Sequence, residues 1–233
     1  RPFIPLHPGY GYHNMAAAHY KFDPTRKYIL HDPDNMPDKI FPGGDLVRML
    51  GMASIQLALL RHADRVKIGC MTGGLGALCC ASHDHVWKSA SYYSFTDLMN
   101  FAKGVSMQVD VRGEKFDIPG YAVDDTSQYT GKTGLNYIDC ACAWDDNSGN
   151  LTLFVINRNQ EKEYDLDIDI SGFKGYKLNS HTELTSRDTE VCSSFENPDV
   201  IVPCENKASS FSGGILSAKV KPLSWNVFRF EKK

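Results

Sequence analysis

Hydrophobic residues recur at helical spacing over residues 46–60. Leu46, Leu50 and Leu57 follow one another at intervals of four and seven residues, which is typical of one face of a helix. Apolar residues also fill most of the other positions, so we expect this helix to be largely buried. Asp45, which follows two glycines, is a suitable N-cap and predicts the start of the helix.

A strand and a second helix are predicted next. Val66, Ile68 and Cys70 alternate with Lys67 and Gly69, which predicts a short strand. Further on, residues 86–103 carry aromatic and aliphatic side chains at helical spacing. Helix, strand, glycine-rich loop and helix in this order predict a β/α unit.

The residues before this β/α unit and the residue that ends it also allow predictions. Residues 1–44 hold most of the chain's eleven prolines, with tyrosines and histidines between them, and predict a long loop. At the other end, Gly104 is expected to form the C-cap of the second helix. The pattern beyond Gly104 is different.

Short segments of alternating apolar and polar residues fill the rest of the chain. They are separated by turn residues and predict an antiparallel β-sandwich. The segments cover residues 134–144, 150–159, 163–172, 176–184, 213–222 and 224–232. The turn-like sequence at 145–150, DDNSGN, predicts a hairpin between the first two. We therefore expect an α/β part over residues 1–104 and an all-β domain over residues 105–233.

Composition adds limits to this picture. The chain has 233 residues, a formal net charge of -3 and a pI of about 6.2, so neither nucleic acid nor an anionic membrane is expected as a partner. The longest apolar run is interrupted by Arg48 and Gln56, so no membrane helix is expected. The seven cysteines contain no Cys-x-x-Cys pair, which favours free thiols in a reducing cytoplasm.

The glycine-rich loop raises the question of a nucleotide site. A phosphate-binding loop needs a lysine soon after Gly74, where this chain has Leu75 and Gly76. A dinucleotide fingerprint fails at its third glycine, which is Cys79 here, and Asp97 lies inside a predicted helix instead of at a strand end. We expect no nucleotide cofactor.

Two other interpretations of the loop remain. A metal cluster of Cys79, Cys80, His83 and His85 would not have the spacing of a common zinc site, so no metal is expected. In a (β/α)8 barrel, by contrast, the loops after the strands form the active site, and glycines let the backbone approach a ligand. The order of predicted elements favours this barrel interpretation.

Four stretches of the sequence resemble one enzyme family. They are RHADRVKIGCM at 61–71, LFVINRN at 153–159, SSFENPDVIVP at 193–203 and KPLSWNVFRFEKK at 221–233. Together they are similar to the α-L-arabinofuranosidases of glycoside hydrolase family 51. The resemblance runs from about residue 46 to the C-terminus.

The resemblance implies the C-terminal portion of a (β/α)8 TIM barrel followed by a jelly-roll β-sandwich. Residues 1–104 would hold the loop after strand seven, helix seven, strand eight and helix eight of the barrel, and residues 105–233 the sandwich. It also implies a retaining hydrolase that removes terminal α-L-arabinofuranosyl groups from arabinoxylan or arabinan oligosaccharides. Such an enzyme uses two carboxyl groups about 5–5.5 Å apart.

The first glutamate of the chain is Glu114, at the edge of the predicted sandwich. By the resemblance, both catalytic glutamates lie upstream of Arg1. We therefore expect no catalytic residue here, a chain that is a fragment from a truncated gene or gene model, and no hydrolysis by the fragment alone.

Other residues are assigned roles by the resemblance. The substrate-adjacent candidates lie in the glycine-rich loop, in the first loop and in the second helix: Met71, Thr72, Gly73, Gly74, Tyr12, His13 and Trp87. Gly73 stands where many family members have a glutamine that contacts the sugar. His62, Asp64 and Arg65 lie at the start of barrel strand eight, where a structural ion-pair and capping role is expected.

The expected partner is an arabinose-containing oligosaccharide, and the full-length enzyme is expected to be a cytoplasmic homo-oligomer, a hexamer being one form. An endo-glucanase specificity also occurs in the family. The alternative function is a non-catalytic carbohydrate-binding sandwich with a barrel remnant. Helices 46–60 and 86–103 are expected to expose apolar faces that other barrel strands would cover, which predicts low solubility.

Overall fold

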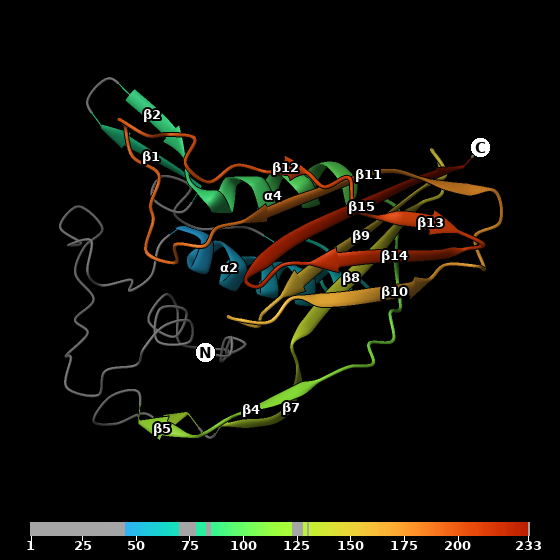
Figure 1. Ribbon diagram of the computed structural model, residues 1–233, viewed down its shortest axis with the longest axis horizontal. Helices are drawn as coiled ribbons and strands as arrows, with labels where there is room; N and C mark the ends of the chain where they lie inside the picture. The colour runs from blue at the N-terminus through green and yellow to red at the C-terminus, as the bar shows by residue number, and fades with distance from the viewer. Residues whose placement is uncertain (1–44, 70–77, 83–84, 123–127, 130, 233) are drawn as a thin grey trace.

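The fold is built of three layers, and a computed structural model describes residues 45–69, 78–82, 85–122, 128–129 and 131–232. A six-stranded antiparallel sheet forms the middle layer, two helices cover one of its faces, and a three-stranded sheet covers the other (Figure 1). The described part of the chain is therefore mostly β-sheet with two helices.

The middle sheet has the strand order β12-β11-β15-β9-β8-β3. These strands are β3 (Val105–Met107), β8 (Ile138–Asp145), β9 (Asn150–Asn157), β11 (Tyr176–Thr185), β12 (Cys204–Glu205) and β15 (Ser224–Lys232). The central strands β9 and β15 are buried on both faces along most of their length. This is the pattern of a strand that lies between two layers.

The second sheet has the order β10-β14-β13, formed by β10 (Tyr164–Asp169), β13 (Ser210–Ser212) and β14 (Ile215–Val220). Its strands alternate, so Leu216, Ala218 and Val220 face inward while the residues between them face solvent. They meet Phe228 and Phe230 of β15 across the interior. The core of the sandwich lies between these two sheets.

Two cysteines belong to this core. Cys140 and Cys142 on β8 are buried against the second sheet, as their alternation predicts. Burial raises the pKa of each thiol to about 12. Thiols in this state are unreactive near neutral pH.

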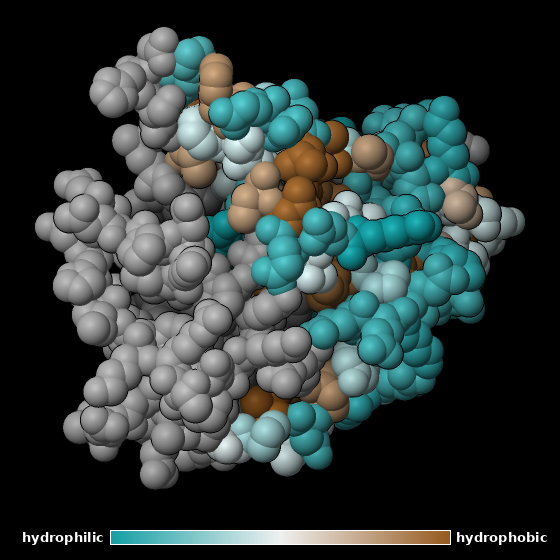
Figure 2. All heavy atoms as spheres, turned by 60° about the vertical axis from the view of Figure 1, so that its left-hand side comes forward, coloured by the Kyte–Doolittle hydropathy of each residue, from teal (hydrophilic) through white to brown (hydrophobic). Residues whose placement is uncertain are grey.

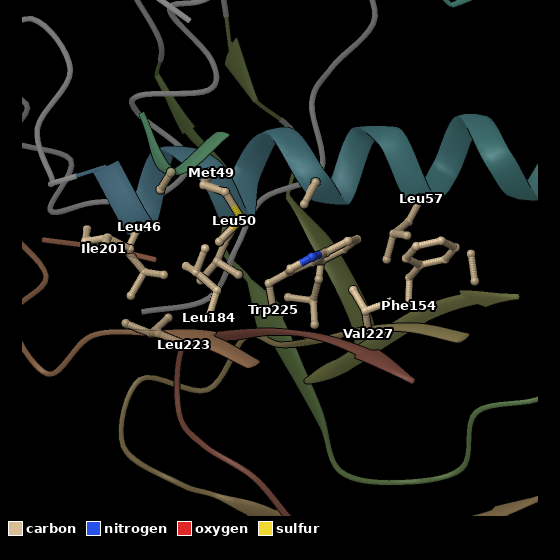
Figure 3. Packing of buried hydrophobic residues seen from close by; sticks show 14 residues of the cluster. Leu46, Met49, Leu50, Leu57, Phe154, Leu184, Ile201, Leu223, Trp225 and Val227 are labelled. Atoms are coloured by element: carbon tan, nitrogen blue, oxygen red, sulfur yellow. The ribbon is translucent and has the colours of Figure 1, made fainter. Parts of the chain in front are cut away.

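The helices α2 (Asp45–Arg61) and α4 (Ala90–Phe101) lie on the opposite face of the middle sheet. Figure 3 shows Leu50 and Leu57 of α2 pointing at Trp225 and Phe154 of the sheet. The rings of Phe154 and Trp225 stack with centroids 5.7 Å apart. Each leucine buried here contributes about 1.5–3 kcal/mol by leaving water.

A hydrogen bond attaches the second helix to β15, the strand that carries Trp225. The indole Nε1 of Trp225 donates to Oδ2 of Asp97 on α4 at 2.9 Å. Burial raises the pKa of Asp97, although this hydrogen bond and the charge of Arg229 act in the opposite direction. Asp97 therefore has a structural role in the interior.

Three small two-stranded antiparallel sheets complete the described structure. They pair β1 (Cys79–Ser82) with β2 (His85–Lys88), β4 (Lys115–Ile118) with β7 (Lys132–Asn136), and β5 (Tyr121–Ala122) with β6 (Gln128–Tyr129). The last two pairs extend away from the sandwich at the lower edge of Figure 1.

Most of the sequence predictions after Gly104 are confirmed. Each of the six alternating segments contains a strand, and DDNSGN forms the turn between β8 and β9, with Asp145 opposite Asn150. Helix 46–60 is also confirmed, one residue longer at each end.

Two predictions in the α/β part are wrong. Residues 66–69 form no strand, since no strand of the described residues pairs with them, and Ile68 is 82% exposed; Cys70 lies outside the described residues. The second helix begins at Ala90, not residue 86, because residues 85–88 pair with β1. The aromatic spacing predicted one helix and gave no sign of the hairpin.

Both predicted helix caps differ in detail. Asp45 is the first helical residue, and its carboxylate accepts a hydrogen bond from the backbone of Ser193. Helix α4 ends at Phe101, three residues before Gly104. Gly104 has a φ of +80°, and a Cβ there would lie 2.2 Å from the carbonyl oxygen of Trp144, so glycine is required for close packing on β8.

The expected exposure of the first helix is wrong. Leu46, Leu50 and Leu57 are fully buried, because the middle sheet covers the face that barrel strands were expected to cover. On α4, Met99 remains 64% exposed. The division of the chain at residue 104 stays a prediction, although both helices share a core with the sandwich.

We predict that Leu50→Ala lowers the free energy of unfolding by about 2–5 kcal/mol, because it leaves a cavity over Trp225. Leu59→Ala on the same helix is the matched control, since Leu59 is 39% exposed and should cost less than about 1 kcal/mol. Urea unfolding of both variants measures the difference. Equal losses would show that the helix is not packed as described.

Candidate functional site

The structure describes four of the ten residues to which the sequence assigns a role. Trp87, His62, Asp64 and Arg65 are described. The other six lie outside the described residues: Tyr12, His13, Met71, Thr72, Gly73 and Gly74.

Trp87 lies on β2 and is half-buried. Its indole Nε1 donates to the backbone carbonyl of Ser193 at 3.1 Å, so that group is engaged within the protein. Next to it, the ring of His85 lies 4.0 Å from the ring of Phe195. The hairpin is therefore attached to the loop that contains Ser193.

The same loop is attached to the start of α2. The backbone N–H of Ser193 donates to Oδ2 of Asp45 at 2.8 Å, and the backbone N–H of Asp45 donates to the carbonyl of Val191 at 3.0 Å. Arg48 donates to Oδ1 of Asp45 at 3.1 Å. We call this arrangement of Asp45, Trp87 and residues 191–195 the hairpin corner. Backbone atoms make most of it, and backbone contacts leave no signal in a sequence.

His62, Asp64 and Arg65 lie at the opposite end of α2 from the hairpin corner. Nη2 of Arg65 is 3.2 Å from Nδ1 of His62, and its Nε is 3.6 Å from Asp64. All three side chains are exposed, and ion pairs of this kind contribute about 1 kcal/mol at most. A helix of 17 residues, roughly 25 Å long, separates them from Trp87, so these residues do not form one site.

A partly buried charge cluster lies beside this second end, with Arg158 as its most buried member. Nη1 of Arg61 donates to Oδ1 of Asp139 at 2.6 Å and to the carbonyl of Cys140 at 2.9 Å. Arg158 donates to the other oxygen of Asp139. Burial lowers the pKa of Arg158, which the charge of Asp139 partly offsets. Asp139, on β8, thus joins the last residue of α2 to Arg158, the residue that follows β9.

Four buried or partly buried carboxyl groups could in principle serve glycoside chemistry. Asp45, Asp97 and Asp139 are bound to donors as described, and Glu183 accepts from Nζ of Lys221 at 2.6 Å. Each of these carboxyl groups is occupied by contacts within the protein. The prediction that the chain contains no catalytic residue is not tested by them and stays a prediction.

A serine, a histidine and an asparagine form a chain of hydrogen bonds that resembles a catalytic triad in connectivity. Nδ1 of His181 is 2.7 Å from Oγ of Ser209, and Nε2 is 3.0 Å from Oδ1 of Asn226. However, His181 is only 2% exposed and its ring stacks on Phe228 at 4.0 Å. A substrate has no access to this imidazole, so the chain of bonds stabilises the interior.

Three further observations concern metal ligands, cysteines and membrane-spanning helices. Among the described residues, no three His, Cys, Asp or Glu side chains gather where they could hold a metal ion. The six described cysteines are all free. Neither described helix is long and apolar enough to cross a membrane.

Comparison with known proteins gives the relationship. The profile of the alpha-L-arabinofuranosidase C-terminal domain matches residues 35–224, most of the chain. The chain belongs to this family. The resemblance to family 51 that the sequence motifs indicated is therefore confirmed.

Curated relatives of this arabinofuranosidase C-terminal chain agree. The intracellular exo-alpha-(1->5)-L-arabinofuranosidase 1 of Bacillus subtilis is 27% identical over 227 residues, which are 95% of this chain and 41% of that protein. The corresponding protein of Halalkalibacterium halodurans is 26% identical over 78% of this chain and 34% of its own length. The chain thus spans about two fifths or less of these relatives.

Solved structures show the same fold. The family 51 alpha-L-arabinofuranosidase AbfB from Bifidobacterium longum superposes with a TM-score of 0.69 at 20% identity, covering 81% of this chain and 35% of that protein. The Thermotoga maritima alpha-L-arabinofuranosidase gives a TM-score of 0.71 at 20% identity, covering 84% and 40%. The mostly β fold with two helices is thus that of a part of these enzymes.

We predict that Asp139→Asn lowers the free energy of unfolding by about 3–5 kcal/mol, because it leaves two guanidinium groups together, one of them buried. Asp110→Asn is the control, since Asp110 is exposed and pairs with the exposed Arg112, so the change should alter stability by less than about 1 kcal/mol. Chemical denaturation measures both. An Asp139→Asn protein as stable as the control would contradict the role of the cluster.

We predict that the buried His181 makes the stability of the fold depend on pH. Burial lowers the pKa of His181, while its bond to Asn226 acts in the opposite direction. Below the unfolded pKa of about 6.5 the unfolded chain binds a proton that the folded chain excludes, so this contribution to stability is present above about pH 6.5 and is lost as pH falls. In His181→Asn the decline in unfolding free energy from about pH 7.5 to 5.5 should be shallower. His62→Asn, at an exposed position, should keep the steeper decline.

Proposed function

We propose that the chain is the C-terminal part of a retaining α-L-arabinofuranosidase, and that the enzyme removes terminal non-reducing α-L-arabinofuranosyl groups from arabinan or arabinoxylan oligosaccharides. The family match over residues 35–224 carries this proposal. Support comes from relatives that are named exo-alpha-(1->5)-L-arabinofuranosidases.

In this proposal the helical layer is the end of a (β/α)8 barrel and the two sheets are the jelly-roll domain behind it. The distribution of exposed apolar side chains supports the assignment. Ile68, Val86, Met99 and Val105 are exposed on or beside the helices and the first hairpin, whereas the outer face of β10 carries aspartates. Figure 2 shows apolar atoms reaching the surface among polar ones on one such face. Exposed apolar surface of this kind suits contact with more protein.

The catalytic carboxyl groups in this proposal lie outside the chain. Retaining hydrolysis needs one carboxyl group as acid and base and one as nucleophile. The first glutamate here is Glu114, an exposed residue that pairs with Lys162 and bonds to Tyr164. The chain would support the barrel, and Trp87 in the hairpin corner would lie near the substrate end. His62, Asp64 and Arg65 would stabilise the other end.

Cell location and assembly follow the relatives in this proposal. Their names place them inside the cell, and the free described cysteines suit a reducing cytoplasm. The full enzyme would be a homo-oligomer. Light scattering of the purified longer protein measures its subunit number.

We predict that the 233-residue chain releases no p-nitrophenol from p-nitrophenyl α-L-arabinofuranoside, because in this proposal the paired carboxyl groups lie outside it. The protein that also includes the sequence encoded before Arg1 should release it. Hydrolysis by the shorter chain would overturn the placement of the carboxyl groups. Activity of the longer protein on carboxymethylcellulose alone would assign an endo-glucanase instead, and inactivity of the longer protein would favour a carbohydrate-binding sandwich.

A further inference from the structure

A cleft of about 410 Å³ opens at the end of the sandwich that lies far from the hairpin corner. The connection from β10 to β11, residues 170–175, forms one side, and the turn from β13 to β14 forms the other. Both connections lie at the right-hand end of Figure 1, near the C-terminus. The volume is within the range of pockets that bind small ligands.

Aromatic rings form the wall of this cleft and are held in place from behind. The centroid of Phe173 lies 5.3 Å from that of Tyr176 and 6.3 Å from that of Trp144, both edge-on. Nε1 of Trp144 donates to the hydroxyl of Tyr176 at 3.0 Å. Phe211 packs edge-on against the fully buried Phe230 at 5.3 Å. Phe173, Tyr176 and Phe211 are nevertheless only half-buried, so ring surface faces the cleft.

The opposite side consists of bare backbone. Gly213 and Gly214 have φ values of +61° and +84°, which favour glycine. A Cβ on Gly214 would lie 2.7 Å from Cα of Ser171, and the carbonyl of Gly214 accepts from the backbone N–H of Ile170 at 2.9 Å. The two connections are thus joined, and the turn places main-chain groups beside the rings without side chains between them.

Polar groups at the rim complete the cleft. Ser171, Ser212 and Lys174 line it, and their side chains carry two hydroxyls and an ammonium group. Lys177 also lines it, but its charge is offset by Glu231 at 2.8 Å. The rim therefore offers hydroxyl and ammonium donors with little excess charge.

We propose that this cleft binds pentose units of an arabino-oligosaccharide at a secondary, non-catalytic site. Sugar rings present C–H faces that pack on aromatic rings, and their hydroxyls match serine, lysine and main-chain groups. The small excess of charge suits a neutral sugar better than a phosphate, which is held by several cations or N–H donors. The choice of pentose rests on the proposed function. The site would hold a polymer chain to the enzyme away from the place of hydrolysis.

The test is titration of the 233-residue chain with α-1,5-linked arabinotriose, followed by the ¹H–¹⁵N NMR peaks of Gly213 and Gly214. We expect saturable shifts of these peaks with a Kd on the order of 1 mM, the weak end of the affinity scale. Ser212→Trp should abolish the shifts, because a large side chain on this exposed position fills the cleft. Phe173→Ala should weaken binding about tenfold, as loss of an aromatic contact does.

Ser210→Trp is the matched control, because Ser210 lies on the same strand, is equally exposed and does not line the cleft. It should bind arabinotriose as the unchanged chain does. Absence of shifts in the unchanged chain, or shifts that survive Ser212→Trp, would overturn the proposal. If the longer protein hydrolyses arabinofuranosides while these peaks do not move, only the cleft proposal fails. If arabinotriose binds here and the longer protein is no hydrolase, only the proposed function fails.

Discussion

Burial of both faces of the central strands is the constraint on which the rest of this structure depends. On β15, Trp225 and Val227 point to the helices while Phe228 and Phe230 point to the second sheet. Strand β9 alternates in the same way, with Phe154 toward the helices. Exposing either face of the strands β9 and β15 to water would be unfavourable, so the fold needs a covering layer on each side of them. Helices α2 and α4 supply one layer and the β10-β14-β13 sheet supplies the other.

Several polar groups that this burial encloses are held by partners within the protein. Asp139 holds two arginines, Glu183 holds Lys221, and His181 lies between Ser209 and Asn226. If one of these groups lost its partner, the protein would lose more stability than the hydrogen bond itself contributes. The cost of removing the remaining group from water would no longer be offset. The perturbed pKa values of Asp97 and His181 have this structural origin. They are therefore poor guides to a catalytic site in this chain.

The strands of the sandwich were predictable because alternation is a local signal. The partner of each face was not predictable, because packing of α2 on the sheet depends on residues far apart in sequence. The strand expected at residues 66–70 failed for the same reason: a strand needs a neighbour, and alternation does not reveal whether one is present. The hairpin at 79–88 was hidden by an aromatic spacing that also suits a helix.

The candidate site was less predictable than the fold. Trp87 was proposed from its residue type and stays a prediction, while its attachment to Ser193 and through it to Asp45 uses backbone atoms that no motif records. The cleft at the other end was also missed, because residues 170–175 and 213–214 are separate turns in sequence and form a surface only after β10 pairs with β14. The two places lie at opposite ends of the sheet. Since the central strands β9 and β15 are buried on both faces along most of their length, the ends of the sheet are where backbone and aromatic rings remain open to a ligand.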